Sequence, residues 1–153
     1  MSDYTAIVKW QRETEAGFTE GQYSRAHVWA FDGGETVRAS AAPSIVPAPW
    51  SDPTGVDPEE AFVASLSSCH MLFFLDLAAR RNYVIDSYTD QAVGTLAIAD
   101  DGKQRMTRVT LNPQVSFSGD RQPDQKAIGK LHHRAHELCF IANSVNTEVV
   151  VNG

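Results

Sequence analysis

Cysteine is scarce in this sequence of 153 residues, which has only Cys69 and Cys139. Two cysteines without a CxxC spacing exclude the disulfide framework of a small secreted protein. Basic residues are also few, since 13 Lys and Arg stand against 19 Asp and Glu and give a net charge of −6. Without an excess of positive charge to neutralise phosphates, a nucleic-acid partner is not expected.

Signals for export and for a membrane span are lacking as well. The first residues carry neither a basic segment nor an apolar one, so no secretory signal is predicted. The most apolar stretch, 61–79, contains His70 and Asp76, and both would be costly inside a bilayer. We therefore expect a cytoplasmic protein with no membrane partner, whose length of 153 residues suits a single domain over 1–153.

The hydrophobic pattern predicts an α+β fold, with strands, a helix, more strands, a second helix and a last strand. The expected strands cover 4–12, 23–31, 35–42, 83–100, 105–118 and 147–152, and the expected helices cover 57–81 and 122–138. Five of the seven prolines fall in 43–58, so no regular structure is expected there. This segment either folds over a site or is a surface connection.

The helix over 57–81 has a well-defined predicted start. Asp57 can cap it, Pro58 suits its first position, and Glu60 completes a capping box. Asn82 is expected to end it. The helix is apolar on nearly every side, and one small sheet can cover only one side. A second copy of the chain is therefore expected to cover the other.

The residues alone leave three interpretations of the cysteines open. Each can be a small buried side chain, because free cysteine is often found in protein cores. The two can form a redox pair, in which one thiolate attacks and the other resolves a sulfenic acid. The third interpretation is a metal site made by His132, His136 and Cys139, which lie on one helical face.

Three motifs bear on these interpretations: Asp57-Pro58-Glu59-Glu60, Ser67-Ser68-Cys69 and His136-Glu137-Leu138-Cys139. Together they resemble the osmotically induced protein C / organic hydroperoxide resistance (OsmC/Ohr) family. The resemblance implies an intertwined α+β homodimer, with antiparallel sheets around a long central cysteine-bearing helix. It also implies a thiol-dependent peroxidase without a cofactor or metal, which reduces organic hydroperoxides and is recycled by a dithiol such as dihydrolipoamide or a lipoylated protein.

The resemblance also implies roles for single residues. Cys69 resembles the peroxidatic cysteine and Cys139 the resolving one. Glu59 corresponds to the family's glutamate, and Arg25 is our choice for its arginine, with Arg38 and Arg12 as alternatives. Glu59 and Cys69 lie ten residues apart, about 15 Å along a helix, so we expect the arginine to bridge them.

An apolar pocket for the organic part of the substrate is expected beside Cys69. Its candidate lining residues are Trp50, Phe62, Leu66, Phe73 and Phe140. Phe140 departs from the family pattern, which usually has proline after the second cysteine. This departure keeps open an alternative function, that of a non-catalytic stress or binding protein with the same fold.

Overall fold

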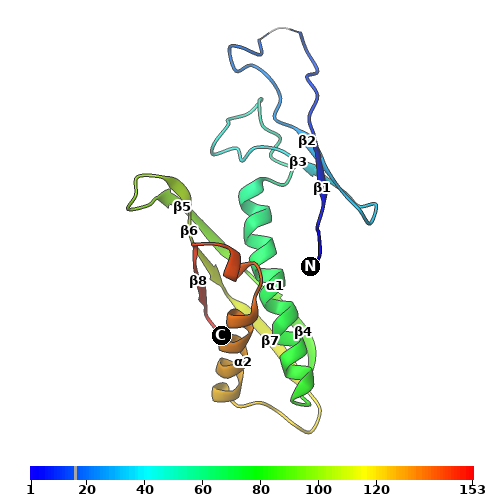
Figure 1. Cartoon of the computed structure of the whole chain (residues 1–153), viewed down its shortest axis with the longest axis vertical. Coiled ribbons are helices and arrows are strands. Elements are labelled where there is room, and N and C mark those ends of the chain that lie inside the picture. Colours follow the sequence, from blue (N-terminus) through cyan, green and yellow to red (C-terminus); the bar gives the residue numbers. More distant parts are fainter. Residues whose placement is uncertain (16) are drawn as a thin grey trace. The chain divides into compact units, whose positions relative to one another are not determined.

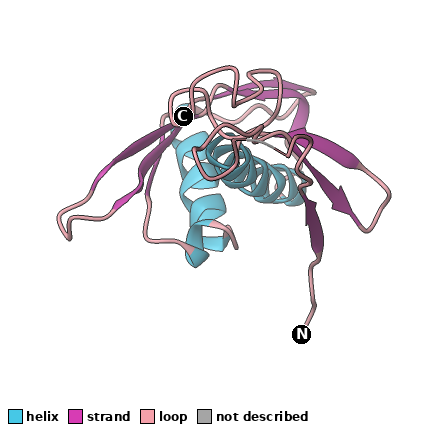
Figure 2. Cartoon of the chain, turned by 90° about the horizontal axis from the view of Figure 1, so that it is seen from above, coloured by secondary structure: helices cyan, strands magenta, loops and turns pink. Residues whose placement is uncertain are grey.

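The computed structural model describes residues 1–15 and 17–153, and the chain divides into two compact units, Met1–Ala61 and Phe62–Gly153. The helices and strands are drawn in Figures 1 and 2. In chain order they are β1 (Ala6–Lys9), β2 (His27–Phe31), β3 (Thr36–Ala39), α1 (Pro58–Arg80), β4 (Val84–Asp90), β5 (Val93–Ile98), β6 (Gln104–Leu111), β7 (Pro113–Ser118), α2 (Gln125–Leu138), a 3₁₀ turn (Ala142–Ser144) and β8 (Glu148–Val151). The predicted α+β class is confirmed.

The first unit contains an antiparallel sheet in the order β1-β2-β3. The second predicted strand begins late, at His27 instead of residue 23. The reason is that Arg25 donates its backbone N–H to the Trp50 carbonyl (2.8 Å), and not to a neighbouring strand. The proline-rich segment 43–58 contains turns and bends before α1 begins, as predicted.

Helix α1 begins with the predicted capping box. The Asp57 carboxylate accepts the Glu60 N–H (2.8 Å), and the Glu60 carboxylate accepts the Asp57 N–H (3.1 Å). At the other end Asn82 has a φ of 57°. The N–H of Tyr83 bonds the Ala78 carbonyl (3.0 Å), and that of Asn82 bonds the Ala79 carbonyl (3.0 Å). This is a Schellman motif, so Asn82 ends the helix as predicted.

The long strands predicted over 83–100 and 105–118 are each broken into two. β4 pairs with β7, while β5 pairs with β6, and β8 joins β6 in parallel. At the break the Asp90 carboxylate accepts the Asn112 N–H (2.6 Å), and the Asn112 amide donates to the Gln91 carbonyl (2.9 Å). These side-chain bonds take the place of backbone hydrogen bonds between strands. The prediction of two continuous strands was therefore wrong at Asp90 and Asn112.

Two apolar clusters form the core of the second unit. One is built around Phe74 and Leu131, and the other around Leu66 and Leu111. The side chains that α1 buries recur every four residues, at Leu66, His70, Phe74 and Ala78. They therefore form one stripe of the helix.

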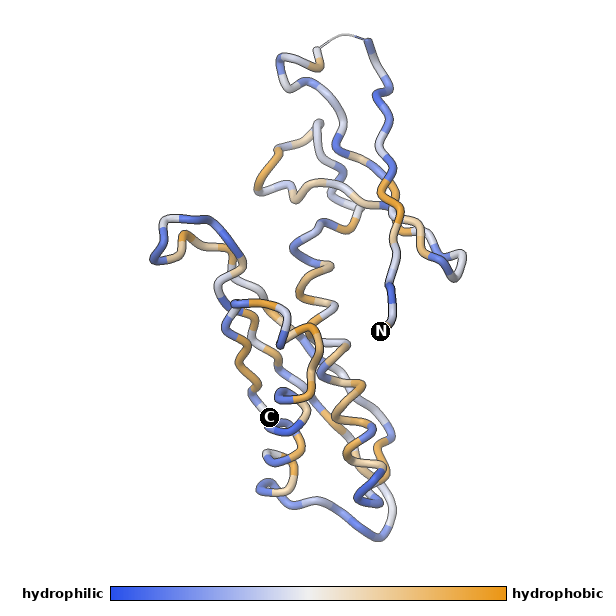
Figure 3. The backbone as a smooth tube through the Cα atoms, viewed as in Figure 1, coloured by the Kyte–Doolittle hydropathy of each residue, from blue (hydrophilic) through white to orange (hydrophobic). Residues whose placement is uncertain are grey.

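The opposite side of α1 is open in the single chain, where Leu72 keeps 60% of its surface exposed. Figure 3 shows apolar positions over most of the length of α1. By length and composition α1 could cross a membrane, but one such helix is a weak indication of a span.

Candidate functional site

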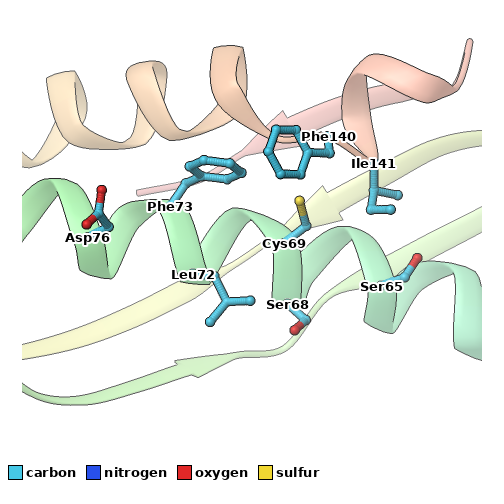
Figure 4. A pocket seen from close by; sticks show the side chains of 8 residues that line it. All are labelled: Ser65, Ser68, Cys69, Leu72, Phe73, Asp76, Phe140 and Ile141. Atoms are coloured by element: carbon cyan, nitrogen blue, oxygen red, sulfur yellow. The ribbon is translucent and has the colours of Figure 1, made fainter. Parts of the chain in front are cut away.

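Cys69 lies in the wall of a cavity of about 460 Å³ in the second unit. The lining is mostly apolar and comes from one face of α1 and from the residues after α2: Ser65, Ser68, Cys69, Leu72, Phe73, Asp76, Phe140 and Ile141. Figure 4 shows the Cys69 sulfur pointing toward the segment that carries Phe140 and Ile141. An apolar molecule in this cavity would lie against a free thiol.

Cys139, the second cysteine, is only 1% exposed. It caps the C-terminus of α2, and its sulfur accepts the Ala142 N–H (3.4 Å). Burial raises the pKa of Cys139 to about 11, and a hydrogen bond between its thiol and Cys69 acts in the same direction. The two thiols are therefore close enough to affect each other, and the Cys139 thiol is protonated at neutral pH.

Only some of the residues predicted to bind the substrate line this cavity, and others belong to the core. Phe73 and Phe140 line the cavity and meet edge to face, with ring centroids 5.0 Å apart. Leu66 is fully buried in the core, and Phe62 packs against the same cluster. The structure places neither in the lining of the Cys69 cavity, because their positions on α1 turn toward β6 and β8.

The residue we predicted as the active-site arginine, Arg25, is firmly held within the first unit. Its Nη1 donates to the carbonyls of Gly21 (2.8 Å) and Tyr23 (2.5 Å). Its guanidinium carbon lies 3.6 Å from the centre of the Tyr23 ring. Arg25 also lines a separate cavity of about 470 Å³ in this unit, together with Trp10. Trp50 accepts the Arg25 N–H through its carbonyl.

Glu59 follows Pro58 in the first turn of α1. Because α1 is one continuous helix, Glu59 and Cys69 are about 15 Å apart along it, too far to touch. The ion pairs of the described residues do not include one between Glu59 and Arg25. Of the alternative arginines, Arg38 pairs with Asp52 (2.6 Å).

Sequence reasoning missed a buried histidine pair between α1 and α2. His70 Nε2 lies 3.0 Å from His132 Nδ1, so one ring donates to the other. Nδ1 of His70 and Nδ1 of His136 are buried without a partner in the described chain. Burial, with smaller contributions from His132 and His136, lowers the pKa of His70 to about 4. Both rings of the pair are therefore neutral at pH 7.

Of the neighbouring α2 histidines, His132 is buried, whereas His133 is exposed. A signal was present in the spacing, because His70 lies four residues after Leu66 and four before Phe74, on the buried face of α1. Nowhere in residues 1–15 and 17–153 are three or more His, Cys, Asp or Glu side chains grouped to hold a metal ion. The structure therefore gives the metal interpretation no support.

A fold with a cysteine-bearing central helix and a second cysteine beside it defines a recognisable class. The family model for OsmC-like proteins matches residues 51–152, and the chain belongs to this family. No match to a curated protein was found.

Solved structures extend the likeness over nearly the whole chain. An OsmC-like protein of unknown function from Vibrio cholerae is 56% identical, with a TM-score of 0.97 and coverage of 99% of both chains. An organic hydroperoxide resistance protein from Elizabethkingia anophelis is 16% identical, with a TM-score of 0.72, and covers 99% of this chain and 94% of its own. OhrB of Bacillus subtilis, another such protein, is 18% identical, with a TM-score of 0.64 and coverage of 99% and 97%. The last two show a shared fold.

Proposed function

We propose that this protein is a thiol-dependent peroxidase that reduces organic hydroperoxides. The observation that carries the proposal is the interaction between two free thiols, of which one lies in the wall of an apolar cavity and the other is buried. The different surroundings assign different roles. Cys69 can be reached from the cavity and attacks, whereas Cys139 is covered and resolves.

The proposed reduction of the hydroperoxide has three steps. The Cys69 thiol first releases its proton. The thiolate then attacks the distal peroxide oxygen, which stays on sulfur with its hydrogen as the sulfenic acid, while the O–O bond breaks and the leaving alkoxide takes up the released proton to become the alcohol. The Cys139 sulfur then attacks the Cys69 sulfur. Its thiol proton and the sulfenic hydroxyl leave as water, and a disulfide forms. A dithiol, for which dihydrolipoamide or a lipoylated protein is our candidate, reduces this disulfide and is itself oxidised.

For Arg25 and Glu59 we propose the roles that the family resemblance implies, in which the arginine acts on the Cys69 thiol and the glutamate acts through the arginine. A guanidinium near a thiol favours the thiolate and can hold a developing oxyanion. The support in this chain is that Arg25 is already oriented, since two carbonyls and the Tyr23 ring fix its guanidinium.

We also propose that the protein works as a homodimer in the cytoplasm, where free thiols persist. The open side of α1 supports the dimer, because Leu72 is 60% exposed and Phe140, beside the same cavity, is 70% exposed. Large apolar side chains gathered on one surface are typical of an interface.

The proposed function is tested by the consumption of cumene hydroperoxide with dihydrolipoamide as reductant. We expect turnover by the wild type, none by Cys69→Ser, and by Cys139→Ser one reduction of peroxide per subunit without efficient recycling. Wild-type protein that is as inactive as Cys69→Ser across several peroxides and dithiols would instead support the non-catalytic alternative.

A further inference from the structure

The Cys69 cavity has a charged group at one end. Cys69, Phe73 and Asp76 follow each other at i, i+4 and i+7 on α1 and therefore share one face of the helix. Seven residues span about 10 Å along the axis. Figure 4 shows Asp76 beyond Phe73 when the cavity is followed away from Cys69. A molecule that reacts at Cys69 and lies along this face extends toward a carboxylate.

The negative charge of Asp76 is only partly balanced by Arg80 on the side that faces the cavity. Asp76 Oδ2 accepts a hydrogen bond from Arg80 Nε at 2.8 Å, but Asp76 lines the cavity and Arg80 does not. The two side chains are 53% and 74% exposed, so the pair is screened and weak. A ligand in the cavity therefore meets the anionic partner of this pair first.

The other side chains that line the cavity are uncharged. They are apolar, thiol or hydroxyl groups, and the Ser65 hydroxyl already donates to the Phe62 carbonyl (2.8 Å). None of the described residues that line the cavity is basic. A substrate carboxylate placed here would lose water against the Phe73–Phe140 pair and face a like charge.

We propose that Asp76 is a specificity-determining residue that makes the Cys69 cavity select hydroperoxides whose organic part is uncharged and reject those that carry a carboxylate. This inference rests on the proposed function and names the substrate class for the same site. Arg80 moderates the selection, because its guanidinium offsets part of the charge of Asp76.

A matched pair of substrates tests the selection. Cumene hydroperoxide with a para-carboxylate and the methyl ester of the same compound differ in charge at the end away from the peroxide. The ratio of kcat/KM for the ester to that for the acid is measured with wild type, Asp76→Asn and Arg80→Gln. Asp120→Asn, at an exposed position before α2, controls for the change in net charge.

The wild type should prefer the ester, and Asp76→Asn should reduce this preference roughly three- to tenfold at low ionic strength. Arg80→Gln should increase the preference, and Asp120→Asn should leave it unchanged. Equal ratios in the wild type and Asp76→Asn, or an equal change in Asp120→Asn, would overturn the inference while leaving the peroxidase proposal in place. A wild type that reduces neither compound would contradict both.

Discussion

Acidification is expected to destabilise the fold through the buried histidine pair. The pKa of His70 is lowered from 6.5 to about 4 in the folded protein, first by burial and then by the nearby His132 and His136. In the unfolded chain the ordinary value returns, so between these two pH values the unfolded state binds more protons. The free energy of unfolding therefore falls as the pH falls through this interval.

The size of this loss follows from the same two values. Acidification from pH 7.5 to pH 5 crosses roughly 1.5 pH units of the interval below 6.5, which corresponds to about 2 kcal/mol for one group. His132 adds to the loss, because burial lowers its pKa too. The window stays above the ordinary pKa values of Asp and Glu, so protonation of carboxylates contributes little.

Urea unfolding at a fixed protein concentration, at several pH values in this window, measures the loss. His70→Gln should flatten the dependence on pH, and the apolar His70→Leu should do the same if the amide disturbs the core. His133→Gln is the matched control, since His133 lies on the same helix as His132 and its side chain is 77% exposed. The same slope in wild type and both His70 variants would refute the reasoning.

Two further predictions concern the start and the open face of α1. Asp57→Ala removes the acceptor for the Glu60 N–H and should lower the free energy of unfolding by about 1 kcal/mol, while Asp57→Asn should recover most of it, as measured by chemical denaturation. Leu72→Glu places a charge on the exposed apolar face and should shift the sedimentation equilibrium from dimer to monomer, whereas Leu72→Met should not. An unchanged dimer in Leu72→Glu would mean that this face is not the interface.

Local features of the sequence predicted much of α1. The capping box at Asp57 and the Asn82 terminus depend on residues close in the chain, so their chemistry can be recognised before the fold is known. The position of Cys69 inside this helix and that of Cys139 at the end of α2 follow from the same local pattern. The family resemblance rests on these motifs.

Contacts between distant parts of the chain were decided only by the tertiary structure. Helical spacing cannot show that the Cys139 thiol, at the end of another helix, is close enough to Cys69 for the two to interact, or that His70 meets His132 across 62 positions. The strand breaks at Asp90 and Asn112 depend on a side-chain bond across 22 positions. Such contacts depend on how the helices and strands pack, whereas periodicity reports only which face of each element is apolar.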